Sequence, residues 1–194
     1  SQARVLATTM AIPFYPCSHQ QGHIAAAAWS AGRMDLLDRP HLVWHLSGGT
    51  TELLHVVPDG VLVKATCIGG TMDISAGPLI DRTGTRLGLA FPAGKAEDAL
   101  SREAAHRDSF RVKVHDASFS FSGLENKMNA LAQQGTSPAD ICWFVLASII
   151  QGVETATRQA LEQYPGLPVL CAGGVASNQL MRERMTQHCG AVFA

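Results

Sequence analysis

The hydrophobic positions along the chain change from helical spacing to strand spacing near residue 40. Before this point, Ser18 can cap a helix that runs to about Gly32. After it, three short β-prone runs follow one another, at residues 41–46, 52–57 and 61–68. The turn sequences Gly48-Gly49 and Pro58-Asp59-Gly60 separate these runs and predict an antiparallel meander.

Helices dominate the rest of the pattern, and a few short strands interrupt them. The predicted helices lie at about residues 2–12, 73–88, 95–105, 122–134 and 177–188, with a long helix that begins near residue 138. The predicted strands lie at residues 15–17, 110–114 and 168–172, and another begins at residue 191. Strand, helix and strand in that order near the end of the chain predict a right-handed parallel crossover.

The long helix has the clearest signals. Ser137 is a good N-cap, Pro138 suits the first helical position, and Asp140 places a negative charge in the first turn. Apolar residues then recur at helical spacing, at Ile141, Val145, Ile149, Val153, Ala156 and Ala160. We therefore expect a core helix.

A three-strand meander followed by helices and parallel strands resembles the ribonuclease H-like lobe of actin-like (ASKHA) ATPases. This resemblance implies an α/β fold in which one lobe is largely complete and the other is partial. Residues 41–194 would form the second lobe, with the nucleotide-binding turns. Residues 1–40 would be a remnant of the first lobe and would carry a helix with a His-x-x-x-His motif.

Composition narrows the class of protein. With 46% hydrophobic and 16% charged residues among 194, the chain can bury a core and is not expected to be disordered. The longest apolar stretch, residues 141–150, is too short to cross a bilayer, so no membrane association is expected. A net charge of -1 gives no basic stripe, so an RNA substrate would need partner proteins to hold it.

The five cysteines are scattered and form no Cys-x-x-Cys pair. Their neighbours are mostly apolar, which indicates reduced core residues of a cytoplasmic protein.

Three glycine-containing segments offer candidate chemistry, at residues 46–53, 69–81 and 171–178. Glycine lets the backbone approach phosphate oxygens, and N–H groups at the start of a following helix attract negative charge. Taken singly, Gly48-Gly49 reads equally well as a plain hairpin turn, and Gly173-Gly174 as packing glycines. Together the segments predict a nucleotide cleft.

The order of the motifs carries a more specific likeness. The motifs are His19-Gln20-Gln21-Gly22-His23, Ser47-Gly48-Gly49, residues 73–81, 87–94 and 119–124, and the Ala-Gly-Gly-Val-Ala-Ser-Asn segment at 172–178. In this order the chain resembles TsaD-type proteins, the tRNA threonylcarbamoyltransferases formerly called O-sialoglycoprotein endopeptidases or glycoproteases. The likeness spans nearly the whole chain.

The resemblance implies transfer of a threonylcarbamoyl group from threonylcarbamoyl-adenylate to N6 of the adenosine adjacent to the tRNA anticodon. It also implies which residues contact the adenylate: Ser47, Gly48, Gly49, Asp81, Gly94 and Asn178, with His45 and Leu46 leading into the first turn. A carboxylate such as Asp81 can accept hydrogen bonds from ribose hydroxyls, and Asn178 can both donate and accept.

His19 and His23 lie four residues apart on a predicted helix, so both imidazoles face one side and could share a metal. The resemblance implies one iron or zinc ion there, acting as a Lewis acid on the threonylcarbamoyl group. It assigns the third ligand to an aspartate beyond Ala194. A zinc peptidase would need Glu at position 20 as general base, and this chain has Gln20.

Several positions depart from the family pattern: Thr50 replaces His, Gln21 replaces Glu, Ile74 and Pro78 replace acidic residues, and Glu125 replaces Lys. These changes favour one alternative, a non-catalytic TsaD- or TsaB-like paralogue that supports the modification complex. The other alternative is the metallopeptidase of the old family name, although it would lack the general base at position 20. The resemblance further implies TsaB- and TsaE-like partners or a homodimer.

The remaining polar residues of these motifs are assigned no chemistry. Asp73 is expected to cap a helix or lie in its first turn, and Lys95, Glu97 and Asp98 to form a solvated helix start. Phe119 and Phe121 are expected in the core, with the serine between them in a turn.

Overall fold

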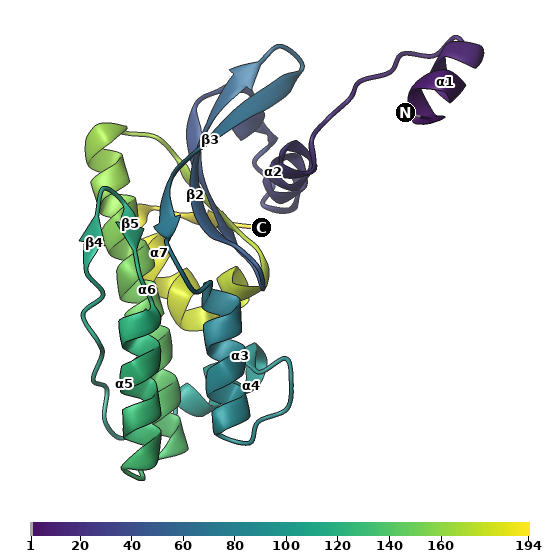
Figure 1. Cartoon of the computed structure of the whole chain (residues 1–194). Helices are drawn as coiled ribbons and strands as arrows, with labels where there is room; N and C mark the ends of the chain where they lie inside the picture. Colours follow the sequence, from purple (N-terminus) through teal and green to yellow (C-terminus); the bar gives the residue numbers. More distant parts are fainter. Residues whose placement is uncertain (1) are drawn as a thin grey trace.

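The computed structural model describes residues 2–194 and is built around one seven-stranded mixed sheet (Figure 1). The strands lie side by side in the order β4-β5-β3-β2-β1-β6-β7. Helices α3, α5, α6 and α7 cover one face of the sheet in the larger hydrophobic core. Helix α2 and the 3-10 helix η1 cover the other face in a smaller core.

The predicted meander is confirmed. Strands β1 (His41–Leu46), β2 (Thr51–Asp59) and β3 (Leu62–Thr71) pair antiparallel, with His45 opposite Glu52 and Glu52 opposite Gly70. Gly60 has a positive φ of 62° in the β2–β3 turn, a conformation that glycine adopts cheaply. Side chains alternate between faces, so Leu42, Trp44 and Leu46 enter the larger core while Val43 enters the smaller one.

The predicted parallel crossover is also present. Strand β6 (Val169–Ala172) pairs parallel with β1, and β7 (Val192–Phe193) pairs parallel with β6. Helix α7 (Gln179–Cys189) connects the two strands and begins after the short 3-10 helix η2 (Gly174–Ser177).

The strand predicted at residues 110–114 is wrong over most of its length. Only Val114–His115 forms a strand, β4, which pairs antiparallel with β5 (Ser118–Phe119). Before it, the Phe110 N–H donates to Ser148 Oγ at 2.7 Å and the Val112 N–H donates to Gln151 Oε1 at 2.9 Å. Side chains of α6 therefore take the place of a neighbouring strand.

Helix α6 (Pro138–Gln163) is the central helix of the larger core, as its apolar spacing predicted. Ser137 Oγ accepts from the Asp140 N–H at 3.1 Å, which confirms the predicted cap. The helix is long and apolar enough to span a membrane, but 78% of its most apolar window is buried inside the protein. A buried core helix has the same composition, and Trp44 Nε1 of β1 donates to its Thr157 Oγ1 at 2.7 Å.

Three further helices follow the meander in the chain: α3 (Ala76–Arg86), α4 (Gly94–Ser101) and α5 (Ser122–Gln133). On the opposite face, α2 (His19–Ser30) packs Ile24, Ala27 and Ala28 against the sheet beside η1 (Met34–Asp38). The Ser18 side chain caps α2 as predicted, accepting from the Gln21 N–H at 3.2 Å.

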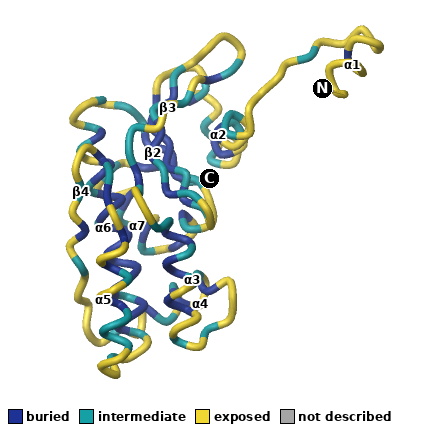
Figure 2. Tube along the Cα trace, in the orientation of Figure 1, coloured by how far each residue is buried: buried dark blue, intermediate teal, exposed yellow. Residues whose placement is uncertain are grey.

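Helix α1 (Gln2–Thr9) stands apart from the sheet at the end of an extended segment (Figures 1 and 2). The strand predicted at residues 15–17 is wrong, because these residues extend without pairing to any strand of the described chain. Most of α1 is exposed, including Val5 and Leu6.

The expectation that all five cysteines are core residues is wrong for two of them. All five are free, and Cys142 and Cys171 are buried, but Cys17 and Cys67 are exposed. Cys17 lies in the extended segment before α2, and Cys67 lies in β3.

Candidate functional site

A cavity of about 490 Å³ lies where the glycine turns meet the helices that follow them. Four of the residues predicted to contact a nucleotide line it: Gly48, Asp81, Gly94 and Asn178. The lining also includes Gly77 of α3, Lys95 and Asp98 of α4, and Ser177 before α7. Segments from three parts of the chain thus converge on one cavity.

The first turn is ordered by its own hydroxyl groups. Ser47 Oγ accepts from the Gly49 and Thr50 N–H groups at 3.3 and 3.1 Å and lies 2.7 Å from Thr50 Oγ1. Thr50, where the family commonly has His, therefore has a structural role in this chain. Ser47 Oγ is used inside the turn, and Gly48 is the residue of this turn that lines the cavity.

The first turn is also fastened to the start of α3. The Ser75 hydroxyl donates to the Gly49 carbonyl at 3.0 Å, and Thr51 Oγ1 accepts from the Ala76 N–H at 2.8 Å. A Cβ on Gly77 would lie 2.6 Å from the Gly48 Cα, so this contact requires glycine at position 77. The sequence analysis named the segment 69–81 but did not single out Gly77.

The third glycine segment touches the first. Gly173 has a φ of 107°, and a Cβ there would lie 2.2 Å from the Leu46 carbonyl oxygen. Only glycine satisfies both the conformation and the close approach. The Leu46 side chain itself is buried in the larger core. The two turns are therefore locked together through backbone.

The side-chain oxygen of Asn178 accepts a hydrogen bond within the protein, whereas its side-chain nitrogen has no partner. Its Oδ1 accepts from the Met181 N–H at 2.9 Å and so caps α7, which begins at Gln179, two residues after the predicted start at residue 177. Its Nδ2 is buried without a hydrogen-bond partner, although the residue is 8% exposed and lines the cavity. A buried N–H group without a partner is costly, which points to a ligand acceptor at this place.

Asp81 shapes the cavity from α3. One of its oxygens, Oδ1, accepts from the Ala93 N–H at 2.9 Å and holds the loop that leads to Gly94. A second carboxylate of the lining, Asp98, accepts from the Gln179 N–H at 3.2 Å and thereby ties α4 to the first turn of α7.

Glu97 contradicts the expectation of a solvated helix start. The side chain is 0% exposed, and neither carboxyl oxygen has a hydrogen-bond partner. The pKa of Glu97 is raised to about 8, chiefly by burial and in addition by the nearby Asp81 carboxylate, with the backbone of Gly84 acting in the opposite direction. The neighbouring Lys95 and Asp98, in contrast, line the cavity as polar residues.

Asp73 is a helix cap, as expected, but it caps α5 and not the helix that follows it. It accepts from the Phe121 and Ser122 N–H groups at 2.9 and 3.1 Å and from both serine hydroxyls of the Ser120–Ser122 segment. Partial burial opposes ionisation of Asp73, but these hydrogen bonds prevail and hold its pKa well below the usual range. Phe119 and Phe121 are buried in the core, as predicted.

The predicted metal pair lies in the first two turns of α2. His19 and His23 are both exposed, and their Nε2 atoms are 2.8 Å apart. His45 of β1 lies beside them, with its ring centroid 5.1 Å from that of His23. Among residues 2–194, no set of three or more His, Cys, Asp or Glu side chains is already arranged as a metal site. The sequence analysis placed His45 before the nucleotide turn, whereas the structure places it against the histidine pair and not in the cavity lining.

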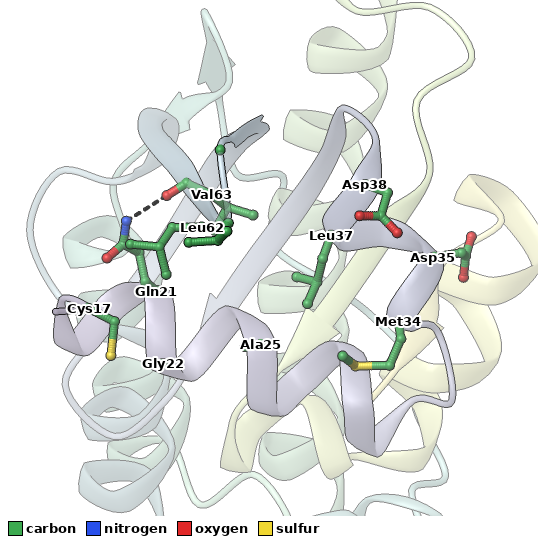
Figure 3. Close-up of a pocket in the computed structure, with 12 residues that line it drawn as sticks. Cys17, Gln21, Gly22, Ala25, Met34, Asp35, Leu37, Asp38, Leu62 and Val63 are labelled. Carbon is green, nitrogen blue, oxygen red and sulfur yellow. Dashed lines mark hydrogen bonds between the residues drawn. The ribbon is translucent and has the colours of Figure 1, made fainter. Parts of the chain in front are cut away.

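The other four departures from the family pattern also have structural explanations. Gln21 completes the capping box of α2, and its Nε2 donates to the Val63 carbonyl at 2.7 Å (Figure 3). Glu125 forms an ion pair with Arg82 at 2.9 Å, which links α5 to α3. Pro78 lies in the first turn of α3, where its missing N–H costs little, and Ile74 packs against the core.

A second cavity, of about 500 Å³, lies on the α2 side of the sheet (Figure 3). Its lining combines Gly22 and Ala25 of α2 with Met34 and Leu37 of η1 and with the β2–β3 hairpin. It contains none of the predicted nucleotide-binding residues.

Two solved structures place this architecture in a known class. The crystal structure of T.kodakarensis HypF superimposes with a TM-score of 0.73 at 13% identity, covering 100% of this chain and 35% of that chain. The crystal structure of full-length HypF in the phosphate- and nucleotide-bound form gives a TM-score of 0.75 at 11% identity, covering 97% and 41%. The chain therefore has an α/β fold of the actin-like type, as the order of its predicted elements implied.

Sequence similarity then identifies the family. The chain belongs to the TsaD family, tRNA N6-adenosine threonylcarbamoyltransferase, whose profile matches residues 1–194. Curated proteins of that name from Enterococcus faecalis and Streptococcus suis are 36% and 34% identical over 95% of this chain. The chain spans about half the length of these relatives, 54% and 56% respectively.

Proposed function

We propose that the protein containing this chain transfers a threonylcarbamoyl group from threonylcarbamoyl-adenylate to N6 of the adenosine adjacent to the tRNA anticodon. Membership of the TsaD family supports the reaction, and the cavity between the glycine turns supports a site for the adenylate. The second HypF structure is of a nucleotide-bound form, which agrees with nucleotide binding by this fold.

The observation that carries the proposal is the unpartnered Nδ2 of Asn178 in the cavity wall. In the proposed complex this N–H₂ donates to an acceptor of the adenylate, while Oδ1 continues to cap α7. Asp81 accepts from ribose hydroxyls through the oxygen that does not bind Ala93. Gly48 and Gly94 let the adenylate approach the backbone closely. Ser47, Gly49 and Leu46 remain predicted to support this site.

For the metal, we propose His19 and His23 as ligands of one iron or zinc ion. Two imidazoles on one exposed helix face are a donor set that suits either ion. Such an ion would supply Lewis-acid polarisation of a carbonyl. The contribution of this chain is to hold both rings on a capped, well-packed helix, since Ser18 fixes its first turn and Ile24 anchors its buried face.

The proposed partners follow from charge and family. A net charge of -1 supports delivery of tRNA through a complex with TsaB- and TsaE-like proteins, or through a homodimer, and not through this chain alone. The burial of the apolar helix α6 in the core and the free cysteines support a cytoplasmic location.

Isothermal titration of the full-length protein with an adenine nucleotide tests the proposed site. Asn178→Asp keeps the oxygen that caps α7 and removes the donor, so we expect nucleotide binding to weaken about tenfold or more. The thermal midpoint of Asn178→Asp, measured in parallel, separates loss of a ligand contact from loss of fold. No binding by the wild-type protein would refute the proposal. Complementation of a strain lacking its own TsaD then tests the transfer and excludes a non-catalytic role if growth is rescued.

A further inference from the structure

Helix α4 carries both a part of the cavity lining and a buried carboxyl group. Gly94, Lys95 and Asp98 of this helix line the cavity that we propose for the adenylate, whereas Glu97 does not line it and is 0% exposed. Neither oxygen of the Glu97 carboxyl group has a hydrogen-bond partner among residues 2–194. The cavity wall is therefore backed by a group whose ionised form the protein does not stabilise.

Hydrogen bonds connect the position of α4 to two other walls of the cavity. The Glu97 N–H donates to the Ala93 carbonyl at 2.9 Å, and the Ala93 N–H donates to Asp81 Oδ1 of α3 at 2.9 Å. The neighbouring Asp98 accepts from the Gln179 N–H, in the first turn of α7, at 3.2 Å. A shift of α4 would therefore disturb the Asp81 wall and the α7 wall together.

Helices α3 and α4 approach each other closely beside Glu97. A Cβ on Gly84 would lie 2.1 Å from the Ala93 Cβ and 3.3 Å from Glu97 Oε1. The gap between the helices is too small for a methyl group at Gly84, so a water molecule cannot enter there. An ionised carboxylate needs water or donors around it, so ionisation of Glu97 favours a displaced α4.

The groups that face Glu97 from the adjacent helices also disfavour its charge. Burial first, and then the Asp81 carboxylate of α3, raise the pKa of Glu97. Cys142 of α6 is a neutral thiol, because burial first and Glu97 second raise its pKa to about 12. The other charged residues of α3 and α4, with the acidic residue in the first turn of α6, are Arg82, Arg86, Lys95, Asp98 and Asp140. All three of these cations are exposed at the surface.

We propose that Glu97 is a positioning residue that holds α4 in the nucleotide-binding arrangement only while its carboxyl group is protonated. The inference rests on the proposed function, because it concerns the same cavity. A nucleotide phosphate in the cavity adds negative charge beside α4 and favours the neutral acid further. Nucleotide binding above about pH 8 therefore takes up one proton, and the affinity falls as pH rises through this value.

Isothermal titration of the full-length protein with adenosine diphosphate, between about pH 7 and about pH 9.5, tests the proposal. The second ionisation of a phosphate ester lies near pH 6, so the ligand keeps its charge over this range. We expect the Kd of the wild-type protein to rise about tenfold across the range. Titration at about pH 9 in two buffers of different ionisation enthalpy should show uptake of about one proton per nucleotide.

Glu97→Gln keeps the size of the side chain and cannot ionise, so it should remove both the pH dependence and the proton uptake. Glu97→Leu, measured in parallel, should do the same and serves if the glutamine variant does not fold. Glu103→Gln is the matched control, because Glu103 is exposed just beyond α4 and its replacement should keep both effects. A role of Glu97 in packing alone would change stability without changing proton uptake.

The possible results are distinct. Wild-type affinity that does not change over this pH range would overturn the inference, as would a pH dependence that survives in both Glu97 variants. Nucleotide binding at pH 7 with such a result would leave the proposed function standing. A wild-type protein that binds no nucleotide at any pH would overturn both.

Discussion

Glu97 offers the sharpest test of the structure, because it is a carboxyl group buried without any hydrogen-bond partner. Its pKa rises from an ordinary 4.5 to about 8, first because of burial and second because of Asp81. The folded protein therefore binds a proton at this site that the unfolded chain releases between pH 4.5 and 8. The free energy of unfolding should fall as pH rises through this window.

The magnitude follows from the shift. Each pH unit between the two pKa values costs about 1.4 kcal/mol, so the penalty is below about 1 kcal/mol at pH 5 and about 3 kcal/mol at pH 7. Above pH 8 it levels off near 5 kcal/mol. Glu97→Leu removes the ionisable group at similar volume. Its stabilisation relative to the wild-type protein should therefore grow by about 4 kcal/mol between pH 5 and pH 8.

Urea denaturation of both full-length proteins at several pH values measures this difference. Glu183→Leu is the control, since Glu183 is exposed on α7 and its replacement should give no comparable pH-dependent gain. A stability difference for Glu97→Leu that does not change with pH would show that Glu97 is ionised or solvated in the folded protein. That result would refute the burial on which the reasoning depends.

Two further predictions concern the glycine contact and the α5 cap. Gly77→Ala should weaken adenine nucleotide binding and destabilise the protein by about 1–3 kcal/mol, because its Cβ would lie 2.6 Å from the Gly48 Cα. Nucleotide titration and urea denaturation measure the two effects. Gly22→Ala is the control, because a Cβ at Gly22 meets nothing within 4 Å. Asp73→Ala should cost about 1 kcal/mol at pH 7. Since the pKa of Asp73 is lowered from 3.8, this difference should shrink as pH falls below about 4, and a constant difference would contradict the capping role.

The sequence predicted the elements whose signals are local. The meander followed from β-prone runs separated by turn residues, and α6 followed from its cap and its apolar spacing. The strand at 110–114 failed because its hydrogen bonds go to Ser148 and Gln151 of a distant helix. Hydrogen bonds from the backbone to side chains of a distant helix produce no periodic pattern in the sequence.

The residues of the candidate site also fall into two groups, those with a local sequence signal and those without one. The glycine turns and Asn178 were recognisable because each turn motif is contained in a short stretch of consecutive residues. Glu97 was not, because its burial depends on Gly84 of α3 leaving space beside it. The position of His45 beside His23 depends on which face of β1 receives α2, and Asp73 caps a helix that starts 49 residues later.

The close approaches of Gly48 to Gly77 and of Gly173 to Leu46 are made between backbone atoms. A clash between two side chains can be relieved when the partner becomes smaller, but a backbone atom cannot be replaced by a smaller one. Mutations at Gly77 or Gly173 therefore have no compensating second-site change at the residue they touch. In a selection for revertants, recovery should come through restoration of glycine itself.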